Sequence, residues 1–407
     1  MCMVRSGALR WLIVVLAAWL QPGCTFLGLP VVRGCYTAAG SRQSDVPVMP
    51  MRRFVILGDF GARHEDRNVR VGLALRNFLD DAAEPHVPTA VLLLGDNFYP
   101  RGLVGTAGTC RRANDTAEVT AQIEAVLGPF AFLRERGIPI LAVPGNHDHA
   151  CGADGLRNQV ELDRFLAPQE RWGPLWRLYS GPPSALAFED ASLQVVLVDS
   201  EPMLQDSRVL RSSLERLDDL VRDGRSRFRW QIVAAHHPLR TAGTHDGAFP
   251  DGLRKPVTLL LFPTHLLAAA NLPPFRALSQ EAYSFRYRRY RSGLEGVLRR
   301  NPGAVDLFLA GHDHSLQLLG AREAGFPMEL VVGSGAYCSP VREGSPAVFA
   351  TAKHGFAVVD VATRMMRVRI YGTSPCGERE ICPAGSGKAY LLYETFLEGA
   401  PRDGTAD

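Results

Sequence analysis

Short apolar runs rich in Val, Ile and Leu recur along most of the chain, each four to seven residues long. Runs of this kind, bounded by Gly, Pro and polar residues, predict buried β-strands. Amphipathic stretches between several of them predict helices. The alternation favours an α/β or layered α+β fold over a helix bundle or an all-β sandwich. The expected strands are Phe54–Leu57, Ala90–Leu94, Ile138–Val143, Leu193–Val198, Trp230–Ala235, Val305–Ala310, Glu329–Val332, Gly355–Val361 and Met366–Tyr371, and the expected helices are Val69–Leu79, Ala117–Arg136 and Arg208–Arg222.

The first residues carry a different pattern. Arg5 and Arg10 precede an unbroken apolar run of ten residues, 11–20. Such a run is too short to cross a bilayer as a helix but is typical of a signal peptide. Cys24 follows Gly23, which resembles a bacterial lipobox, in which the cysteine becomes the lipidated first residue. The alternative is ordinary cleavage nearby, with Cys24 left as a thiol.

We therefore predict a signal peptide of the lipoprotein type at residues 1–23. The mature protein is expected to be exported and to be periplasmic, held at the cell envelope or secreted. No later segment reaches 18 uninterrupted apolar residues, so lipid on Cys24 is the one membrane contact that we expect.

Composition limits the classes of function. The chain has 407 residues, 46% of them hydrophobic, which excludes a largely disordered protein. Its 45 basic and 42 acidic residues give a net charge of +3, and residues 1–23 contribute two of those positive charges. The chain after residue 23 is therefore nearly neutral and lacks the excess of basic residues that is typical of nucleic-acid-binding proteins, so no nucleic-acid partner is expected.

Export also affects how the cysteines are interpreted. Without Cys2 and Cys24, six cysteines remain, an even number in an oxidising compartment. Six cysteines allow 15 connectivities, and the sequence does not choose among them. Cys376 and Cys382 are close enough to close a small loop. The chain has no CxxC pair, so a zinc site built from thiolates is not expected. The six are Cys35, Cys110, Cys151, Cys338, Cys376 and Cys382.

Five of the predicted strands end in a cluster of polar residues. Ligand sites in α/β folds form at the carboxyl ends of strands, where loops converge. The clusters offer oxygen and imidazole donors without thiolates, which suits iron, zinc or manganese. Seven or eight donors exceed the needs of one tetrahedral zinc and predict two metal ions. The clusters are Gly58–Gly61, Gly95–Tyr99, Gly145–His149, Ala235–Pro238 and Gly311–His314.

The five clusters, in this order, resemble the calcineurin-like metallophosphoesterase superfamily. In its commoner first motif, Asp-x-His, a histidine stands where this chain has Gly61. Tyr99, three residues after Asp96, is similar to the tyrosine that replaces that histidine in purple (tartrate-resistant) acid phosphatases. The resemblance covers about residues 54–372. It implies a sandwich of two mixed β-sheets flanked by helices, in a catalytic domain at 51–375 between a linker at 24–50 and a C-terminal extension at 376–407.

The resemblance also implies a ligand set. The first metal would be held by Asp59, Asp96, Tyr99 and His314, and the second by Asp96, Asn146, His236 and His312. Asp96 would be the shared bridge. A tyrosine has a pKa near 10, so a phenolate ligand needs a strongly acidic cation, and Fe(III) meets this need better than Zn(II). We expect Fe(III) at Tyr99 and Fe(II), Zn(II) or Mn(II) at the second position.

Other histidines leave alternatives open. His236 and His237 both lie beside Pro238, and the family pattern His-x-Pro favours His236. His147 and His245 are the expected catalytic residues, and either could donate a proton to the leaving alcohol. Asp148 is interpreted as a carboxylate that orients a neighbouring histidine. His149 is either a rim residue or a solvated loop residue.

Two segments add to this core. The stretch Phe285–Arg291 is either a substrate wall whose arginines meet phosphate or an amphipathic helix with a solvated face, and we favour the helix. The stretch Gly102–Thr116 is expected to lie near the mouth of the site.

The function that we predict is an exported, monomeric dinuclear-metal acid phosphatase that hydrolyses small phosphomonoesters by attack of a metal-bound hydroxide. The alternatives are a phosphodiesterase or nucleotidase on the same core and, less favoured, a non-catalytic phosphate- or metal-binding protein.

Overall fold

The computed structural model describes residues 35–37, 49–62, 67–246, 284–321, 323–342, 347–373 and 387–399. The chain divides into the units Met1–Pro30 and Val31–Asp407, and all described residues belong to the second. The predicted signal peptide, Cys24 and the tail at 400–407 therefore lie outside the described residues. Among the described helices, none is both long and apolar enough to cross a bilayer.

A seven-stranded sheet forms one half of the fold, in the order β15-β14-β13-β2-β3-β4-β5. Its strands β2 to β5 are parallel, and β13, β14 and β15 extend it in antiparallel fashion. The strands are β2 (Arg52–Leu57), β3 (Ala90–Leu94), β4 (Ile140–Val143), β5 (Trp176–Leu178), β13 (Gly355–Val361), β14 (Met365–Thr373) and β15 (Ala389–Glu398).

An eight-stranded sheet forms the other half, in the order β1-β12-β10-β11-β9-β8-β7-β6. Here β7, β8, β9 and β11 are parallel, and the other pairings are antiparallel. The strands are β1 (Cys35–Thr37), β6 (Ser184–Phe188), β7 (Leu193–Val198), β8 (Trp230–Ala235), β9 (Leu307–Ala310), β10 (Leu316–Leu319), β11 (Met328–Val332) and β12 (Ala347–Thr351).

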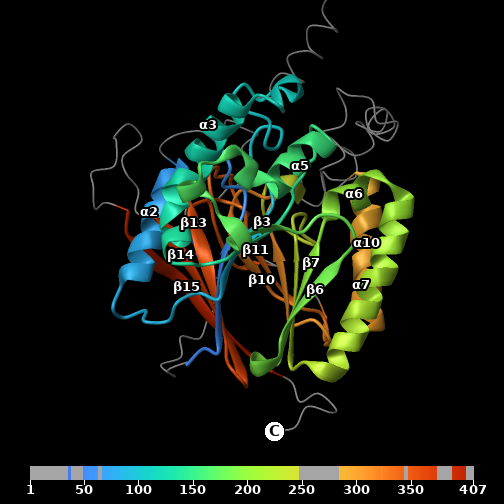
Figure 1. Cartoon of the computed structure of the whole chain (residues 1–407). Coiled ribbons are helices and arrows are strands. Elements are labelled where there is room, and N and C mark those ends of the chain that lie inside the picture. The colour runs from blue at the N-terminus through green and yellow to red at the C-terminus, as the bar shows by residue number, and fades with distance from the viewer. Residues whose placement is uncertain are drawn as a thin grey trace, which may run out of the picture. The chain divides into compact units, whose positions relative to one another are not determined.

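Alternate residues of each strand pack into different layers. In β2, Phe54 and Ile56 belong to the apolar cluster that also contains Val195 and Leu197 of β7, so the two sheets face each other. The intervening Val55 of β2 packs on the opposite face, with α2 and α3. The outer face of the second sheet packs against α6, α7 and α10. Figure 1 shows these helices flanking the two sheets. The predicted sandwich of two mixed sheets is confirmed.

The helices are α2 (Arg67–Asp80), α3 (Thr116–Leu127), α4 (Ala131–Glu135), α5 (Ala153–Val160), α6 (Ser200–Gln205), α7 (Ser207–Arg227) and α10 (Phe285–Arg300). The single helix predicted at Ala117–Arg136 is wrong. It is interrupted by a 3₁₀ turn, Gly128–Phe130, because Pro129 has no N–H to donate within a helix. As favoured from the sequence, Phe285–Arg291 begins an amphipathic helix, in which Tyr287 and Tyr290 are buried and Arg288 and Arg289 are exposed.

The predicted linker and extension each supply a strand. Residues 35–37 of the linker form β1, which pairs with β12. Residues 389–398 of the extension form β15, which pairs along its whole length with β14. Tyr393 of β15 is buried and stacks on Phe349 with ring centroids 5.1 Å apart, which fixes this edge strand to the core.

Candidate metal centre

The five polar clusters lie together because they follow five strands whose carboxyl ends meet at one end of the sandwich. Asp59 follows β2, Asp96 and Tyr99 follow β3, and Asn146 and His147 follow β4. His236 follows β8 of the other sheet, and His312 and His314 follow β9. Backbone hydrogen bonds join neighbouring loops, from Asp59 N to Gly95 O at 3.0 Å and from Gly311 N to His236 O at 3.0 Å.

Glycines allow these loops to approach closely. A Cβ on Gly95 would lie 2.5 Å from His236 Nδ1, and one on Gly145 would lie 2.2 Å from Asp96 Oδ1. Three ligand candidates themselves have positive φ, namely Asp59 at 55°, Asp96 at 53° and His312 at 67°. Such angles are costly for residues with a Cβ and are concentrated at functional sites.

The first predicted ligand set converges. The Tyr99 hydroxyl donates to Asp59 Oδ1 at 3.0 Å and lies 3.2 Å from His314 Nε2. His314 Nε2 is in turn 3.5 Å from Asp59 Oδ1. Asp59 and Tyr99 are buried, at 0% and 5% exposed, so three ligand types share one small space.

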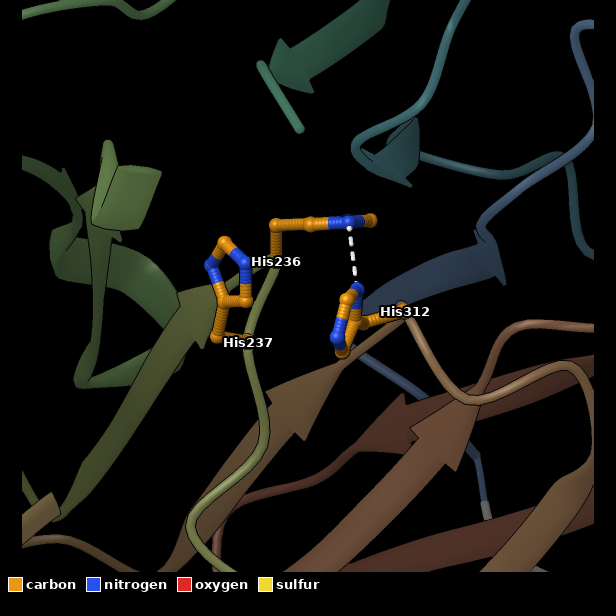
Figure 2. Close-up of side chains that lie close together, drawn as sticks. All are labelled: His236, His237 and His312. Atoms are coloured by element: carbon orange, nitrogen blue, oxygen red, sulfur yellow. Dashed lines mark hydrogen bonds between the residues drawn. The ribbon is translucent and has the colours of Figure 1, made fainter. Parts of the chain in front are cut away.

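The second set also converges. His236 Nε2 lies 3.3 Å from His312 Nδ1 (Figure 2). The same nitrogen lies 3.0 Å from Asn146 Oδ1 and 3.6 Å from Asp96 Oδ1. Ligand atoms of Asp59, Asp96 and His236 all lie within 4.8 Å of one another. Asp96 therefore stands between the two sets, where a bridging carboxylate is expected.

His236 and His237 have different surroundings. His236 Nδ1 donates to the carbonyl of Leu94 at 2.7 Å, which leaves Nε2 facing the other candidate ligands. In Figure 2 a hydrogen bond joins His236 to His312, and the His237 ring lies beside them, with its centroid 4.5 Å from that of His312. The Nδ1 of His237 lies 2.8 Å from Ser200 Oγ, and its Nε2 lies 3.7 Å from Glu201 Oε2. His237 nevertheless lies close enough to His236 and His312 to form a ligand trio with them.

The electrostatics fit bound cations. Burial raises the pKa of Asp59 to about 8. Burial, and then the carboxylates of Asp59 and Asp96, raise the pKa of Tyr99 well above its usual 10. Burial lowers the pKa of His314 to about 4, so its imidazole is neutral and able to bind a metal. Within the described part of the chain, no lysine or arginine pairs with Asp59 or Asp96. A metal ion is the charge that would compensate these buried acids.

The two predicted catalytic histidines lie beside the ligands. His147 Nδ1 donates to Pro100 O at 2.7 Å, and its Nε2 lies 3.9 Å from Asp96 Oδ2. Its ring is 4.4 Å from that of Tyr99. The ring of His245 stacks on His312, 4.1 Å away with an interplanar angle of 27°.

Asp148 has a role that differs from the expected one. This fully buried carboxylate contacts no histidine ring by hydrogen bond among the described residues. It accepts from the backbone N–H groups of Asn97, Phe98 and Gly145 at 3.0, 3.1 and 2.8 Å, and from Gln159 Nε2 at 2.9 Å. Asp148 thus joins the loop that carries Asp96 to the loop that carries Asn146. Its position inside the Gly145–His149 cluster was the only sequence signal of this role.

Sequence analysis also missed the partner of His149. Its Nε2 lies 2.8 Å from Asp199 Oδ1, at the end of β7, and the other oxygen of Asp199 accepts from Gly181 N at 3.0 Å. Burial alone would lower the pKa of His149, but the hydrogen bond to Asp199 raises it. His149 is therefore held by Asp199 at the edge of the site and is not a solvated loop residue.

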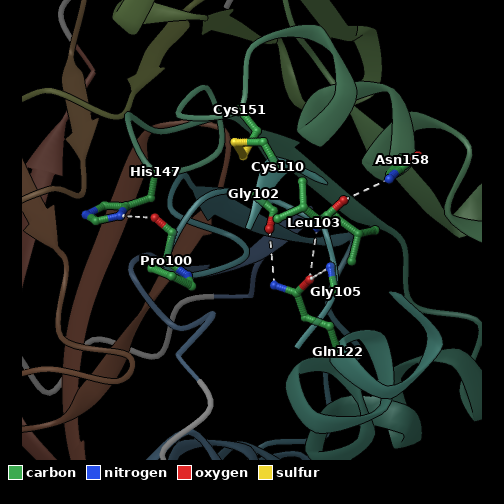
Figure 3. The surroundings of a disulfide bond; sticks show 10 residues. Pro100, Gly102, Leu103, Gly105, Cys110, Gln122, His147, Cys151 and Asn158 are labelled. Carbon is green, nitrogen blue, oxygen red and sulfur yellow. Dashed lines mark hydrogen bonds between the residues drawn. A yellow bond between two sulfur atoms is a disulfide. The ribbon is translucent and has the colours of Figure 1, made fainter. Parts of the chain in front are cut away.

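One disulfide lies near the site. Cys110 and Cys151 are joined, with their Cα atoms 5.4 Å apart, and so link the loop after β3 to the loop after β4 (Figure 3). A Cβ on Gly102 would lie 2.7 Å from Asp148 O, and Cys110 is bonded to Cys151, so the segment Gly102–Thr116 lies against the loop that carries His147. The possible bridge between Cys376 and Cys382 lies outside the described residues.

The comparisons agree with this geometry. The family model for calcineurin-like phosphoesterases matches residues 52–316. Among solved structures, GAP50, the anchor in the inner membrane complex of Plasmodium, is 15% identical with a TM-score of 0.56, over 88% of this chain and 91% of that one. PhoD is 12% identical with a TM-score of 0.52, over 86% of this chain and 70% of that one. Both likenesses concern the fold alone. No curated protein matches significantly. The chain belongs to the calcineurin-like phosphoesterase family.

Proposed function

We propose that this protein is a dinuclear-metal phosphomonoesterase of the purple acid phosphatase type. The observation that carries the proposal is the place of Tyr99, whose hydroxyl lies within 3.2 Å of both Asp59 Oδ1 and His314 Nε2. A buried phenol among anionic and imidazole ligands suits a ferric ion, which is acidic enough to remove its proton.

The chain would hold the two ions with separate donor sets. Asp59, Tyr99 and His314 would bind the first ion, Asn146, His236 and His312 the second, and Asp96 both. When bound, such a pair supplies an acidified water and neutralises charge on the phosphate, and a ferric member would favour a pH optimum below neutrality.

Two side chains would handle the leaving alcohol. His147 is exposed on 38% of its side chain and is oriented by Pro100 O, so its Nε2 is accessible from the mouth of the site. His245 is the second of these side chains, and its ring stacks on that of His312. Donation of a proton by such a residue typically contributes about 10²–10⁴-fold in rate.

Metal analysis combined with the visible spectrum tests the proposal. We expect two metal ions per chain, at least one of them iron, and a visible band that Tyr99→Phe removes. The enzyme should cleave p-nitrophenyl phosphate faster than bis(p-nitrophenyl) phosphate. A colourless active protein with an alkaline optimum, or a preference for the diester, would instead indicate a nucleotidase- or phosphodiesterase-like relative.

We further propose that the protein is exported and anchored through lipid on Cys24. The support is the sequence Gly23-Cys24 directly after the apolar run. Comparison of membrane fractions of the native protein and Cys24→Ser in the native host tests this. An unchanged membrane-bound share, or an intact mass without acyl groups, would reject lipidation.

A further inference from the structure

The segment that follows β8 is held by a group of buried polar side chains that lies beside the cluster Gly311–His314. Gln317 of β10 is fully buried, and Thr241 is 4% exposed. The neighbours of Gln317 in β10, Leu316 and Leu318, belong to the apolar cluster between the sheets, and Leu319 belongs to the outer cluster. A buried amide in this strand is costly unless it is fully hydrogen-bonded.

Both the oxygen and the nitrogen of the Gln317 amide form hydrogen bonds with the segment that follows β8. Its Oε1 accepts from Ala242 N at 2.7 Å. Its Nε2 donates to Thr241 Oγ1 at 2.9 Å and to Ser315 Oγ at 2.6 Å. The amide therefore fixes the backbone and the side chain of two successive residues.

Thr241 continues the connection to Asp313. Its hydroxyl donates to Asp313 Oδ2 at 2.6 Å and accepts from Gly243 N at 2.9 Å. The same Asp313 oxygen accepts from His245 N at 3.3 Å. Gly243 lies so close that a Cβ there would be 2.0 Å from Asp313 Oδ1. Asp313 lies in the chain between the candidate metal ligands His312 and His314.

We propose that Thr241 and Gln317 are positioning residues for His245. Together with Asp313 they join the segment His312–His314, which carries two candidate ligands, to the segment that carries His245. The His245 ring, stacked on His312, then keeps a fixed place relative to the candidate ligands. This inference rests on the proposed function, because it assigns His245 the transfer of a proton to the leaving alcohol.

Thr241→Val removes the hydroxyl but keeps the shape of the side chain, and Thr241→Ser keeps the hydroxyl. Kinetics should be measured with an alkyl phosphate, whose leaving group needs a proton, and with p-nitrophenyl phosphate, whose leaving group hardly does. We expect Thr241→Val to lower kcat on the alkyl ester by about tenfold or more, with less than a threefold change on the aryl ester and little change in KM. Thr241→Ser should restore most of the loss.

A double-mutant cycle shows whether the effect acts through His245. In a His245→Ala background, Thr241→Val should cause no further loss on the alkyl ester, because the residue that it positions is absent. Equal losses on both esters, or losses that add to those of His245→Ala, would overturn the proposal. Thr120→Val is the matched control, since it removes a 2.7 Å hydroxyl bond to Phe165 O from the remote helix α3.

Amide hydrogen exchange tests the same contacts without reference to activity. The N–H groups of Ala242, Gly243 and His245 all donate into this group of side chains. The peptide containing them should exchange faster in Thr241→Val and at the native rate in Thr241→Ser and Thr120→Val. Unchanged protection in Thr241→Val would overturn the positioning role. A native enzyme that cleaves neither ester would refute the proposed function instead.

Discussion

Replacement of Asp148 should lower both the stability of the fold and the affinity for metal, and alanine should lower the stability more than asparagine. The carboxylate is 0% exposed and accepts four hydrogen bonds, two at each oxygen. In Asp148→Asn the remaining oxygen can keep two of them, for example those from Asn97 N and Gly145 N. The new amide group would then face Phe98 N and Gln159 Nε2, which are both donors.

The cost follows from counting buried donors that lose their acceptor. Gln159 can offer an oxygen by rotating its amide, which gives up only the long 3.4 Å bond from Asn97 Nδ2, but the Phe98 N–H cannot adapt. One unsatisfied buried donor costs about 1–3 kcal/mol, which is our expectation for Asp148→Asn. Asp148→Ala leaves three backbone N–H groups without an acceptor and should cost at least about 3 kcal/mol. Metal affinity should fall about 10–100-fold, since the lost contacts orient two ligand loops.

Urea unfolding of the metal-free protein, together with metal titration of the folded variants, measures both effects. Asp163→Asn is the control, because Asp163 accepts from Trp172 N and Gly173 N, each at 2.7 Å, away from the site. It should lose stability and keep native metal affinity. If Asp148→Ala unfolds at the native urea midpoint, or if asparagine costs more than alanine, our account of Asp148 is wrong.

Three further predictions concern separate charged groups. Asp96→Ala should lose both metals and all activity, and a variant that retains two metals by elemental analysis would contradict its bridging position. Asp360→Asn should cost about 3–5 kcal/mol in urea unfolding, because Asp360 is fully buried and pairs with Arg53 at 2.6 Å. The link from His149 to Asp199 raises the pKa of His149, so its stabilisation should be complete below pH about 6.5 and lost as pH rises through the higher folded value. Melting temperatures of the metal-free protein should show this loss, and His149→Gln should abolish it.

Most strands buried on both faces were predictable because their apolar runs are continuous, whereas β10 was missed because Gln317 interrupts its short run. The runs at Leu193–Val198 and Trp230–Ala235 match β7 and β8 residue for residue. Half-buried edge strands such as β15 were not predicted from the sequence. In β15 only Tyr393 is buried, and polar Thr395 and Glu394 interrupt any apolar pattern. The pairing of β15 with β14 depends on the rest of the sheet, which no local window of sequence contains.

The proximity of the candidate ligands was predictable in outline because strand ends converge, but their supporting contacts were not. Asp148 binds backbone N–H groups, which are the same in every sequence, so no residue pattern marks its partners. The pairing of Cys110 with Cys151 depends on how two loops fold back on each other. The different surroundings of His236 and His237 also depend on tertiary contacts, with Leu94 O beside one ring and Ser200 Oγ beside the other.

The left-handed backbone at Asp59, Asp96 and His312 also has an evolutionary consequence. For a residue with a Cβ this conformation costs about 1–2 kcal/mol, whereas glycine adopts it freely. At Asp59 and Asp96 glycine would also remove the acceptors of His312 N and His147 N, so relief of the backbone cost is clearest at His312. Selection for catalysis opposes that gain, because glycine there removes a ligand. A lineage that used the sandwich only as a scaffold would lose this opposition, and its descendants should accumulate glycine first at the position of His312.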